Sequence, residues 1–261
     1  MSLPPPIHAT AQVDSSAVLG AGTTVGPYAV IGPEVSLGPG CVVGPHVVIG
    51  GPAAFGAGNR FYPFACLGMD PQDLKYAGER TSLEVGDENI FREGVTVHRG
   101  TAGGGGTTRV GSRNLLMAQT HVAHDCQVGS QVIFANAATL AGHVTVEDGA
   151  TIGAFSGVHQ FCRVGEHAYI GGYSVITQDA LPYVLTVGNR ARSFGINVIG
   201  LERKKFSAEA IQALKQAYRT LFRSRLTLEA ALERLDRERA DQPEVGRLAA
   251  FIRTSTRGVI R

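Results

Sequence analysis

Residues 19–48 read LGAGTT-VGPYAV-IGPEVS-LGPGCV-VGPHVV, five six-residue units that each begin with Leu, Val or Ile. The same period extends in both directions. Stepping back by six reaches Ile7, and stepping forward meets an aliphatic residue or Phe at nearly every position. The apolar residues are missing at two successive positions of the period, 73 and 79, and return at Val85. A Gly-rich insert (103–106) then displaces the repeat by one residue, and the repeat continues to Ile176. Glycine follows immediately after 14 of these 26 apolar positions, so the period is a property of the chain and not of one segment.

A period of six fits neither a lone amphipathic helix nor an alternating strand. It is typical of a parallel β-helix, with one short strand per hexad and three hexads per triangular coil. Each inward side chain then stacks on its equivalent three hexads later, in coils about 4.8 Å apart. The handedness rule for parallel crossovers favours a right-handed coil, but the period alone leaves the hand open. We expect a solenoid over residues 1–188, with loops inserted near 69–84 and 100–109.

Residues 189–261 predict a connector followed by a small α-helical domain. Ser207 is a suitable N-cap, and apolar residues then recur at intervals of three and four. A second helix is expected after Thr227 and a third near Pro243, because proline is favoured in a first helical turn. The purely structural role expected of such a domain is to cover one end of the solenoid.

Composition and charge narrow the classes of protein. Apolar residues make up 44% of the chain, which excludes wholesale disorder, and no stretch approaches the length of a membrane span. The N-terminus lacks a secretory leader, and the four cysteines form no C-x-x-C pair, so we expect a cytoplasmic protein without disulfides. Residues 201–261 carry 14 Lys and Arg against 8 Asp and Glu, whereas residues 1–200 carry 10 against 14. This basic tail suggests a polyanionic partner.

Histidines gather on one face of the predicted coil. A step of three hexads places His124 under Gly142 and Gly142 under Gln160, and the neighbouring inward residues turn these positions outward. The predicted strip comprises His124, His143, His159 and Gln160, and His121 lies at the adjoining corner. A single outward histidine is usually a surface residue, but several in one strip favour a functional site.

His124 and Asp125 suggest a general base and the carboxylate that orients it. No G-x-S-x-G nucleophile motif is present, and Cys126 is best interpreted as a buried structural thiol. A base without a nucleophile suggests direct attack by a substrate hydroxyl or amine. Lys75, in the first break of the period, and the run Arg203-Lys204-Lys205 are each either phosphate ligands or solvated charges.

Specific motifs add a family resemblance that covers nearly the whole chain. The hexads resemble those of the left-handed β-helix acyltransferases, and the remaining motifs resemble those of the UDP-N-acetylglucosamine O-acyltransferases. These motifs are Gln72-Asp73-Leu74-Lys75-Tyr76-Ala77-Gly78-Glu79, His98-Arg99-Gly100-Thr101, His121-Val122-Ala123-His124-Asp125-Cys126, Leu140-Ala141-Gly142-His143, His159-Gln160-Phe161-Cys162 and Ser255-Thr256-Arg257-Gly258.

The resemblance implies an all-β left-handed parallel β-helix that forms a homotrimer with active sites between subunits. It implies transfer of an (R)-3-hydroxyacyl chain from acyl carrier protein to the 3-hydroxyl of UDP-N-acetylglucosamine, the first step of lipid A biosynthesis. The phosphopantetheine arm of the carrier presents the acyl group, so no resident cofactor, no metal and no nucleic acid is implied.

The resemblance also implies roles for individual residues. His124 is the expected base, Asp125 its partner, and the Gly142 N–H the donor to the oxyanion. The residues expected to position the sugar, the diphosphate or the acyl hydroxyl are Gln72, Asp73, Lys75, His98, His121, His143, His159 and Gln160. Those expected near the nucleotide are Asn197, Arg203 and Lys204. Gly172 occupies the position that limits acyl-chain depth, where glycine leaves room for a longer chain than a bulky residue.

Two positions depart from the family pattern. Ile199 stands where a polar, nucleotide-contacting residue is expected, and Lys204 replaces an arginine, which removes bidentate phosphate geometry.

Other functions stay open on the sequence. The same chemistry on a 3-amino UDP-sugar is one, and an acetyl-CoA-dependent acetyltransferase of the same superfamily is another. A β-helical zinc carbonic anhydrase needs three histidine ligands, and a non-catalytic solenoid would repeat one side chain along a face. The related N-acyltransferases carry an additional N-terminal domain, for which the hexads starting at Ile7 leave no room.

Overall fold

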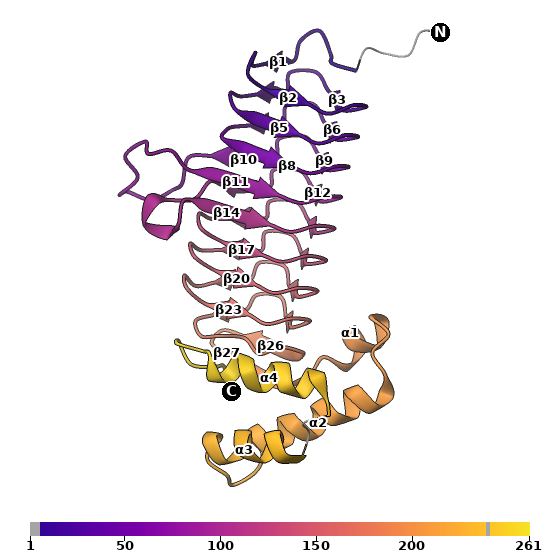
Figure 1. Cartoon of the computed structure of the whole chain (residues 1–261), viewed down its shortest axis with the longest axis vertical. Coiled ribbons are helices and arrows are strands. Elements are labelled where there is room, and N and C mark those ends of the chain that lie inside the picture. The colour runs from indigo at the N-terminus through magenta and orange to yellow at the C-terminus, as the bar shows by residue number, and fades with distance from the viewer. Residues whose placement is uncertain (1–5, 239–240) are drawn as a thin grey trace.

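The chain forms a tall triangular coil of short parallel strands with helices at its C-terminal end, and the first strand, β1 (Gln12–Val13), lies at the opposite end (Figure 1). The computed structural model describes residues 6–238 and 241–261. The three faces of the coil are three sheets, each built by strands that recur once per turn.

Most strands are only two residues long. Sheet 1 contains β1 (Gln12–Val13), β4 (Val30–Ile31), β7 (Val48–Ile49), β10 (Cys66–Met69), β13 (Thr96–His98), β16 (His121–Val122), β19 (Thr139–Leu140), β22 (Gly157–Val158) and β25 (Val175–Ile176). Sheet 2 contains β2 (Val18–Leu19), β5 (Val35–Leu37), β8 (Ala53–Phe55), β11 (Ser82–Val85), β14 (Thr107–Val110), β17 (Gln127–Val128), β20 (Thr145–Val146) and β23 (Arg163–Val164). Sheet 3 contains β3 (Thr24–Val25), β6 (Val42–Val43), β9 (Arg60–Phe61), β12 (Ile90–Phe91), β15 (Leu115–Leu116), β18 (Ile133–Phe134), β21 (Thr151–Ile152), β24 (Tyr169–Ile170), β26 (Val184–Gly188) and β27 (Ala191–Ile196).

The core is the stack of periodic apolar side chains that the hexads predict. Leu116 pairs with Phe134 in the parallel register, and Phe134 pairs with Ile152, each pair spanning three hexads. All three side chains are fully buried. The predicted stacking of equivalent residues in successive coils is therefore confirmed.

The corners between sheets use a left-handed backbone conformation. Residues with positive φ recur every six positions, and non-glycine residues occupy most of them: Gln119, Asp125, Gln131, Ala137, His143, Phe155, Phe161, His167 and Tyr173. L-amino acids reach this region only at a cost, which the backbone hydrogen bonds between successive coils offset. One such bond runs from His143 N to His124 O (3.0 Å).

The coil is left-handed, as the near strands β2, β5 and β8 and the descent of the chain show in Figure 1. This agrees with the family resemblance and contradicts the general rule for parallel crossovers. That rule applies to twisted strands joined by long connections. Here the strands are two residues long and the corners are single tight turns.

The two breaks in the period form loops on the same corner, between sheet 1 and sheet 2. Val85 pairs with Phe55 across the first loop, and Val110 pairs with Val85 across the second, so each loop adds residues without changing the register. Strand pairing extends into the margins of both predicted breaks, and the loops occupy residues 70–81 and 99–106. The second loop contains the short 3₁₀ helix η1 (Ala102–Gly104).

In the part of the C-terminal segment that the structure describes, four α-helices follow: α1 (Val198–Arg203), α2 (Ala208–Phe222), α3 (Leu228–Glu238) and α4 (Pro243–Arg253). The predicted helices α2, α3 and α4 are confirmed, and the Ser207 side chain caps α2 by accepting from Ala210 N. The short helix α1 and strand β27 were not predicted. Strand β27 pairs antiparallel with β26, so the sheet extends past residue 188, the predicted limit of the solenoid.

The helices cover the C-terminal end of the coil. Tyr183 and Val184 of the last turn share one buried cluster with Leu214 of α2 and Leu248 of α4. Among the described residues, no helix is long and apolar enough to cross a membrane.

Candidate active site

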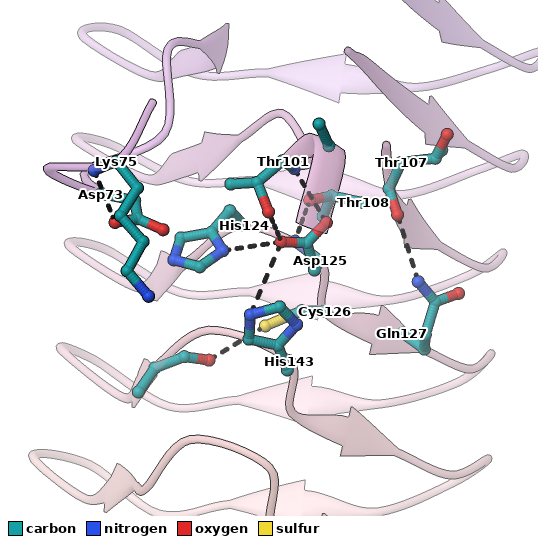
Figure 2. A network of polar contacts seen from close by, with 12 residues as sticks. Asp73, Lys75, Thr101, Thr107, Thr108, His124, Asp125, Cys126, Gln127 and His143 are labelled. Atoms are coloured by element: carbon teal, nitrogen blue, oxygen red, sulfur yellow. Dashed lines mark hydrogen bonds and ion pairs between the residues drawn. The ribbon is translucent and has the colours of Figure 1, made fainter. Parts of the chain in front are cut away.

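The corner between sheets 1 and 2 holds the predicted base and its carboxylate. Strand β16 ends at the inward Val122, and the next corner presents His124 and Asp125. His124 Nδ1 lies 2.7 Å from Asp125 Oδ2 (Figure 2). An ionised carboxylate there accepts the Nδ1–H and leaves Nε2 as the basic nitrogen.

Asp125 is buried and well supplied with donors. The Thr101 N–H donates to Oδ1 (2.8 Å) and the Thr101 hydroxyl to Oδ2 (2.7 Å). Burial raises the pKa of Asp125, but the hydrogen bonds from Thr101 and His124 outweigh burial and lower the pKa below its usual value. Its own N–H donates to the Thr108 hydroxyl (2.8 Å). The carboxylate therefore stays charged and fixed beside His124.

The next coil supplies Gly142 and His143, as the step of three hexads predicts. A Cβ built on Gly142 would lie 2.5 Å from Cε1 of His124, so any side chain there displaces the imidazole. The His143 ring stands perpendicular to that of His124, with centroids 5.1 Å apart, and stacks on Phe161 of the following coil at 4.5 Å. The His124 ring is thus confined between a glycine backbone and an aromatic stack.

His98 and His121 lie on sheet 1, beside the His124–Asp125 dyad. Their rings meet edge to face with centroids 5.0 Å apart, and His121 Nδ1 is 2.7 Å from the Thr96 hydroxyl. Burial, and then the charges of His121 and His124, lower the pKa of His98 to about 4. Burial, and then the His124 charge, also lower the pKa of His121. Both imidazoles are therefore neutral near pH 7, and buried His98 Nδ1 has no hydrogen-bond partner among the described residues.

The loop 70–81 brings Asp73 and Lys75 to the same corner. The Lys75 N–H donates to Asp73 Oδ1 (3.0 Å), and the Lys75 side chain extends toward the level of His124 and His143 (Figure 2). Lys75 and Gln72 are exposed.

His159 and Gln160 lie one coil further along, both exposed, with His159 Nδ1 3.2 Å from Gln160 O. Gly172 lies on another corner, between sheets 3 and 1, where a Cβ would approach Ala154 O at 3.3 Å.

The predicted nucleotide residues gather elsewhere, at the corner between sheets 2 and 3. A cavity of about 610 Å³ is lined by residues that include Asn197, Ile199, Arg203 and Lys204. Asn197 caps α1 and donates to His167 O (3.2 Å), which fixes α1 against the coil. A single chain does not bring these residues to His124, because the width of sheet 2 separates the two corners.

Within residues 6–238 and 241–261, His124, Asp125 and His143 form the group that could hold a metal ion, since one ligand atom from each lies within 4.8 Å of the others. However, the Asp125 oxygens already accept hydrogen bonds from Thr101 and His124. Cys126 is buried inside the coil, and desolvation raises the pKa of its thiol to about 12, so it is not a nucleophile at neutral pH.

Sequence reasoning missed Thr101 as a partner of Asp125. Thr101 lies in the second loop, where the period that locates the other residues is interrupted. The Gly-rich run that follows Thr101 is a sequence feature that could have indicated this contact. A Cβ on Gly104 would collide with the Asp125 carboxylate, so the loop can close over the carboxylate only with glycine there.

Comparisons with known proteins agree over nearly the full length. A family profile described as UDP N-acetylglucosamine O-acyltransferase, domain 2, matches residues 179–260, and one described as bacterial transferase hexapeptide (six repeats) matches residues 16–51 and 143–178. A protein from Alkalilimnicola ehrlichii named acyl-[acyl-carrier-protein]–UDP-N-acetylglucosamine O-acyltransferase is 53% identical over 98% of this chain and 99% of its own. The solved structure of LpxA from Acinetobacter baumannii is 44% identical, with a TM-score of 0.95 over 98% of this chain and 100% of its own. A UDP-N-acetylglucosamine acyltransferase from Arabidopsis is 35% identical, with a TM-score of 0.85 over 98% of this chain and 100% of its own.

The burial of His98 predicts a pH dependence of stability. Between about pH 6.5 and pH 4 the unfolded state binds a proton at His98 that the folded state does not, so the free energy of unfolding falls as the pH is lowered through this window. We expect His98→Gln to reduce that fall, measured by urea unfolding at pH 7 and pH 4.5. The exposed His8 provides the matched control, His8→Gln. An identical pH dependence in wild type and His98→Gln would contradict the burial argument.

Proposed function

The chain belongs to the UDP-N-acetylglucosamine O-acyltransferase family, and we propose that it transfers an (R)-3-hydroxyacyl chain from acyl carrier protein to the sugar 3-hydroxyl with His124 as general base. This reaction is the first step of lipid A biosynthesis. The observation that carries the mechanism is the 2.7 Å contact between His124 Nδ1 and buried Asp125, which leaves Nε2 free to accept a proton.

The acyl transfer proceeds by direct attack. His124 Nε2 accepts the proton of the sugar 3-hydroxyl as its oxygen bonds to the thioester carbonyl carbon, and the carbonyl electrons move to oxygen. Collapse of the tetrahedral intermediate breaks the carbon–sulfur bond, and protonated His124 returns the proton to the phosphopantetheine thiolate. The negative charge of Asp125 stabilises His124 in its protonated form throughout.

Gly142 supplies the donor to the oxyanion. Its neighbours are engaged, Ala141 N with Val158 O and His143 N with His124 O, whereas the Gly142 N–H has no backbone partner among the described residues. A fixed backbone donor next to the base stabilises developing charge without reorganisation.

Other residues around His124 position the substrates. Lys75 offers a cation to the diphosphate, and Asp73 in the same loop accepts hydrogen bonds from the sugar. His98 and His121 are neutral and offer ring nitrogens for hydrogen bonds without competing for the transferred proton. Gln72, His143, His159 and Gln160 complete this set.

A homotrimer with sites between subunits accounts for the separation of the two groups of residues. The corner that carries Asn197, Arg203 and Lys204 reaches His124 only if it comes from a neighbouring copy. Exposed aromatic stacks on the corner between sheets 3 and 1 suit such an assembly: Tyr28 on His46 (5.2 Å), His46 on Phe64 (5.3 Å), and Phe155 on Tyr173 (5.1 Å).

Three residues, Ile199, Lys204 and Gly172, set the particular features of the nucleotide and acyl subsites in this chain. Ile199 is 65% exposed beside Arg203 and Lys204, and it offers the nucleotide an apolar surface in place of a polar contact. Lys204 contacts Gln131 (3.4 Å) and offers a single-point charge. A side chain at Gly172 would crowd Ala154 O, and the glycine avoids that contact at the corner where a bulky residue would shorten the acyl chain.

The substrate pair is tested by assaying purified protein with carrier-protein thioesters of several lengths, each with UDP-N-acetylglucosamine and with its 3-amino analogue. We expect ester formation with the 3-hydroxy sugar and a preference for one length of 3-hydroxyacyl chain. Faster transfer to the 3-amino sugar would replace the proposed acceptor. Turnover of acetyl-CoA instead would contradict the proposed donor.

His124→Ala removes the base, and we expect kcat to fall about 10²- to 10⁴-fold, the usual contribution of a general base. Gly142→Ala keeps the N–H but forces the His124 ring aside, so it should also lower kcat. Thr139→Ala, an exposed substitution in the same coil, is the control. Circular dichroism and the thermal midpoint verify folding, and near-normal kcat in His124→Ala would exclude it as the base.

The basic C-terminal segment offers a docking site for the acidic carrier protein. Arg219 in α2 and Arg223 and Arg225 after it are exposed. Replacing all three by Gln should raise KM for the carrier thioester and weaken its dependence on salt, with kcat retained, because complementary charge mainly speeds association. An unchanged KM and salt dependence would place the docking site elsewhere.

A further inference from the structure

Arg99 is a buried arginine immediately after strand β13, and its guanidinium joins the first loop to the coil. Nη1 donates to Gly68 O (2.6 Å) and to Gly51 O (3.0 Å). Nη2 forms an ion pair with Asp70 and donates to the Tyr76 hydroxyl (3.1 Å). The Arg99 side chain is only 10% exposed, so these bonds are largely shielded from water.

The partners of Arg99 bracket the substrate segment of the loop. Asp70 precedes residues 72–75 and Tyr76 follows them, so one guanidinium ties both ends of the segment that carries Asp73 and Lys75. A planar fork with five donors can serve four acceptors at once, which the compact ammonium of a lysine cannot do. The segment itself is largely exposed, and the bonds at its two ends limit where Lys75 can reach.

The same contacts continue into the second loop. The Tyr76 hydroxyl donates to Glu79 O (3.1 Å), and the Glu79 carboxylate accepts from Ala77 N (2.8 Å) and from Ala102 N (3.5 Å). Ala102 follows Thr101, whose N–H and hydroxyl hold Asp125. The loop that bears Lys75 and the loop that orients the dyad are thus joined.

We propose that Arg99 is a positioning residue that fixes both ends of the segment 72–75 and thereby places Lys75 against the acceptor nucleotide sugar. The proposal rests on the function proposed above. Arg99 contacts neither substrate nor reacting atoms in this account. It acts through Lys75, and this makes it separable from a residue that only stabilises the fold.

A double-mutant cycle with Lys75 tests the proposal in the full-length protein. We expect Arg99→Met to raise KM for UDP-N-acetylglucosamine by about 10- to 100-fold, the size of effect that misplaced binding groups produce, and to leave the pH profile of kcat unchanged. In a Lys75→Ala background the same substitution should raise KM less than about twofold, because residues that act through one another are not additive. Arg99→Lys should recover part of the loss.

The matched control is Arg80→Met. Arg80 lies in the same loop as residues 72–75, and the substitution removes its exposed ion pair with Glu34 of the coil. It should leave KM unchanged. Hydrogen exchange of residues 70–81 adds a readout that needs no turnover, and Arg99→Met, but not Arg80→Met, should speed it. Additive effects in the cycle, or unchanged exchange in Arg99→Met, would overturn the proposal. If the wild-type protein fails to acylate UDP-N-acetylglucosamine, the proposed function fails, while the exchange result still decides whether Arg99 holds the loop.

Discussion

Every sixth side chain in the coil points inward and stacks on its equivalent in the next coil, and this register fixes the position of everything on the surface. The strands are too short to hold the register alone. It is held by continuous apolar contact through the core and by corners whose positive φ recurs at every sixth position. A shift of one residue would turn the apolar set outward and bury exposed polar residues such as Thr139, so the arrangement has no near alternative.

The residues proposed to react owe their placement to this register. His124 and Gly142 occupy equivalent places in successive coils, so the ring of one rests on the backbone of the other. The two loops leave the coil at the same corner, and each brings a polar group that the period cannot supply. The second loop brings Thr101 to a buried carboxylate, whose charge would otherwise be costly in that environment. The first brings Lys75 under the control of Arg99.

The period accounts for what could be predicted from the sequence. The stack of His124 and Gly142, the inward core and both loop positions follow from counting in sixes, and α2 and α4 follow from Ser207 and Pro243. The partners of Asp125 and the contacts of Arg99 could not be found in this way, because they involve the two loops, where the six-residue repeat is interrupted. Helix α1 and strand β27 follow the last hexad and are too short to show a period of their own. The hand of the coil came from the resemblance, since the general crossover rule fails for two-residue strands.

A crystal structure of the protein with its acylated nucleotide-sugar product would show where the reaction takes place. We expect the ester oxygen of the sugar to lie beside His124 Nε2 and the ester carbonyl oxygen about 3 Å from Gly142 N, with the nucleotide reaching Asn197 of a second copy. A product bound away from the corner between sheets 1 and 2, or contacted by one chain alone, would contradict this expectation.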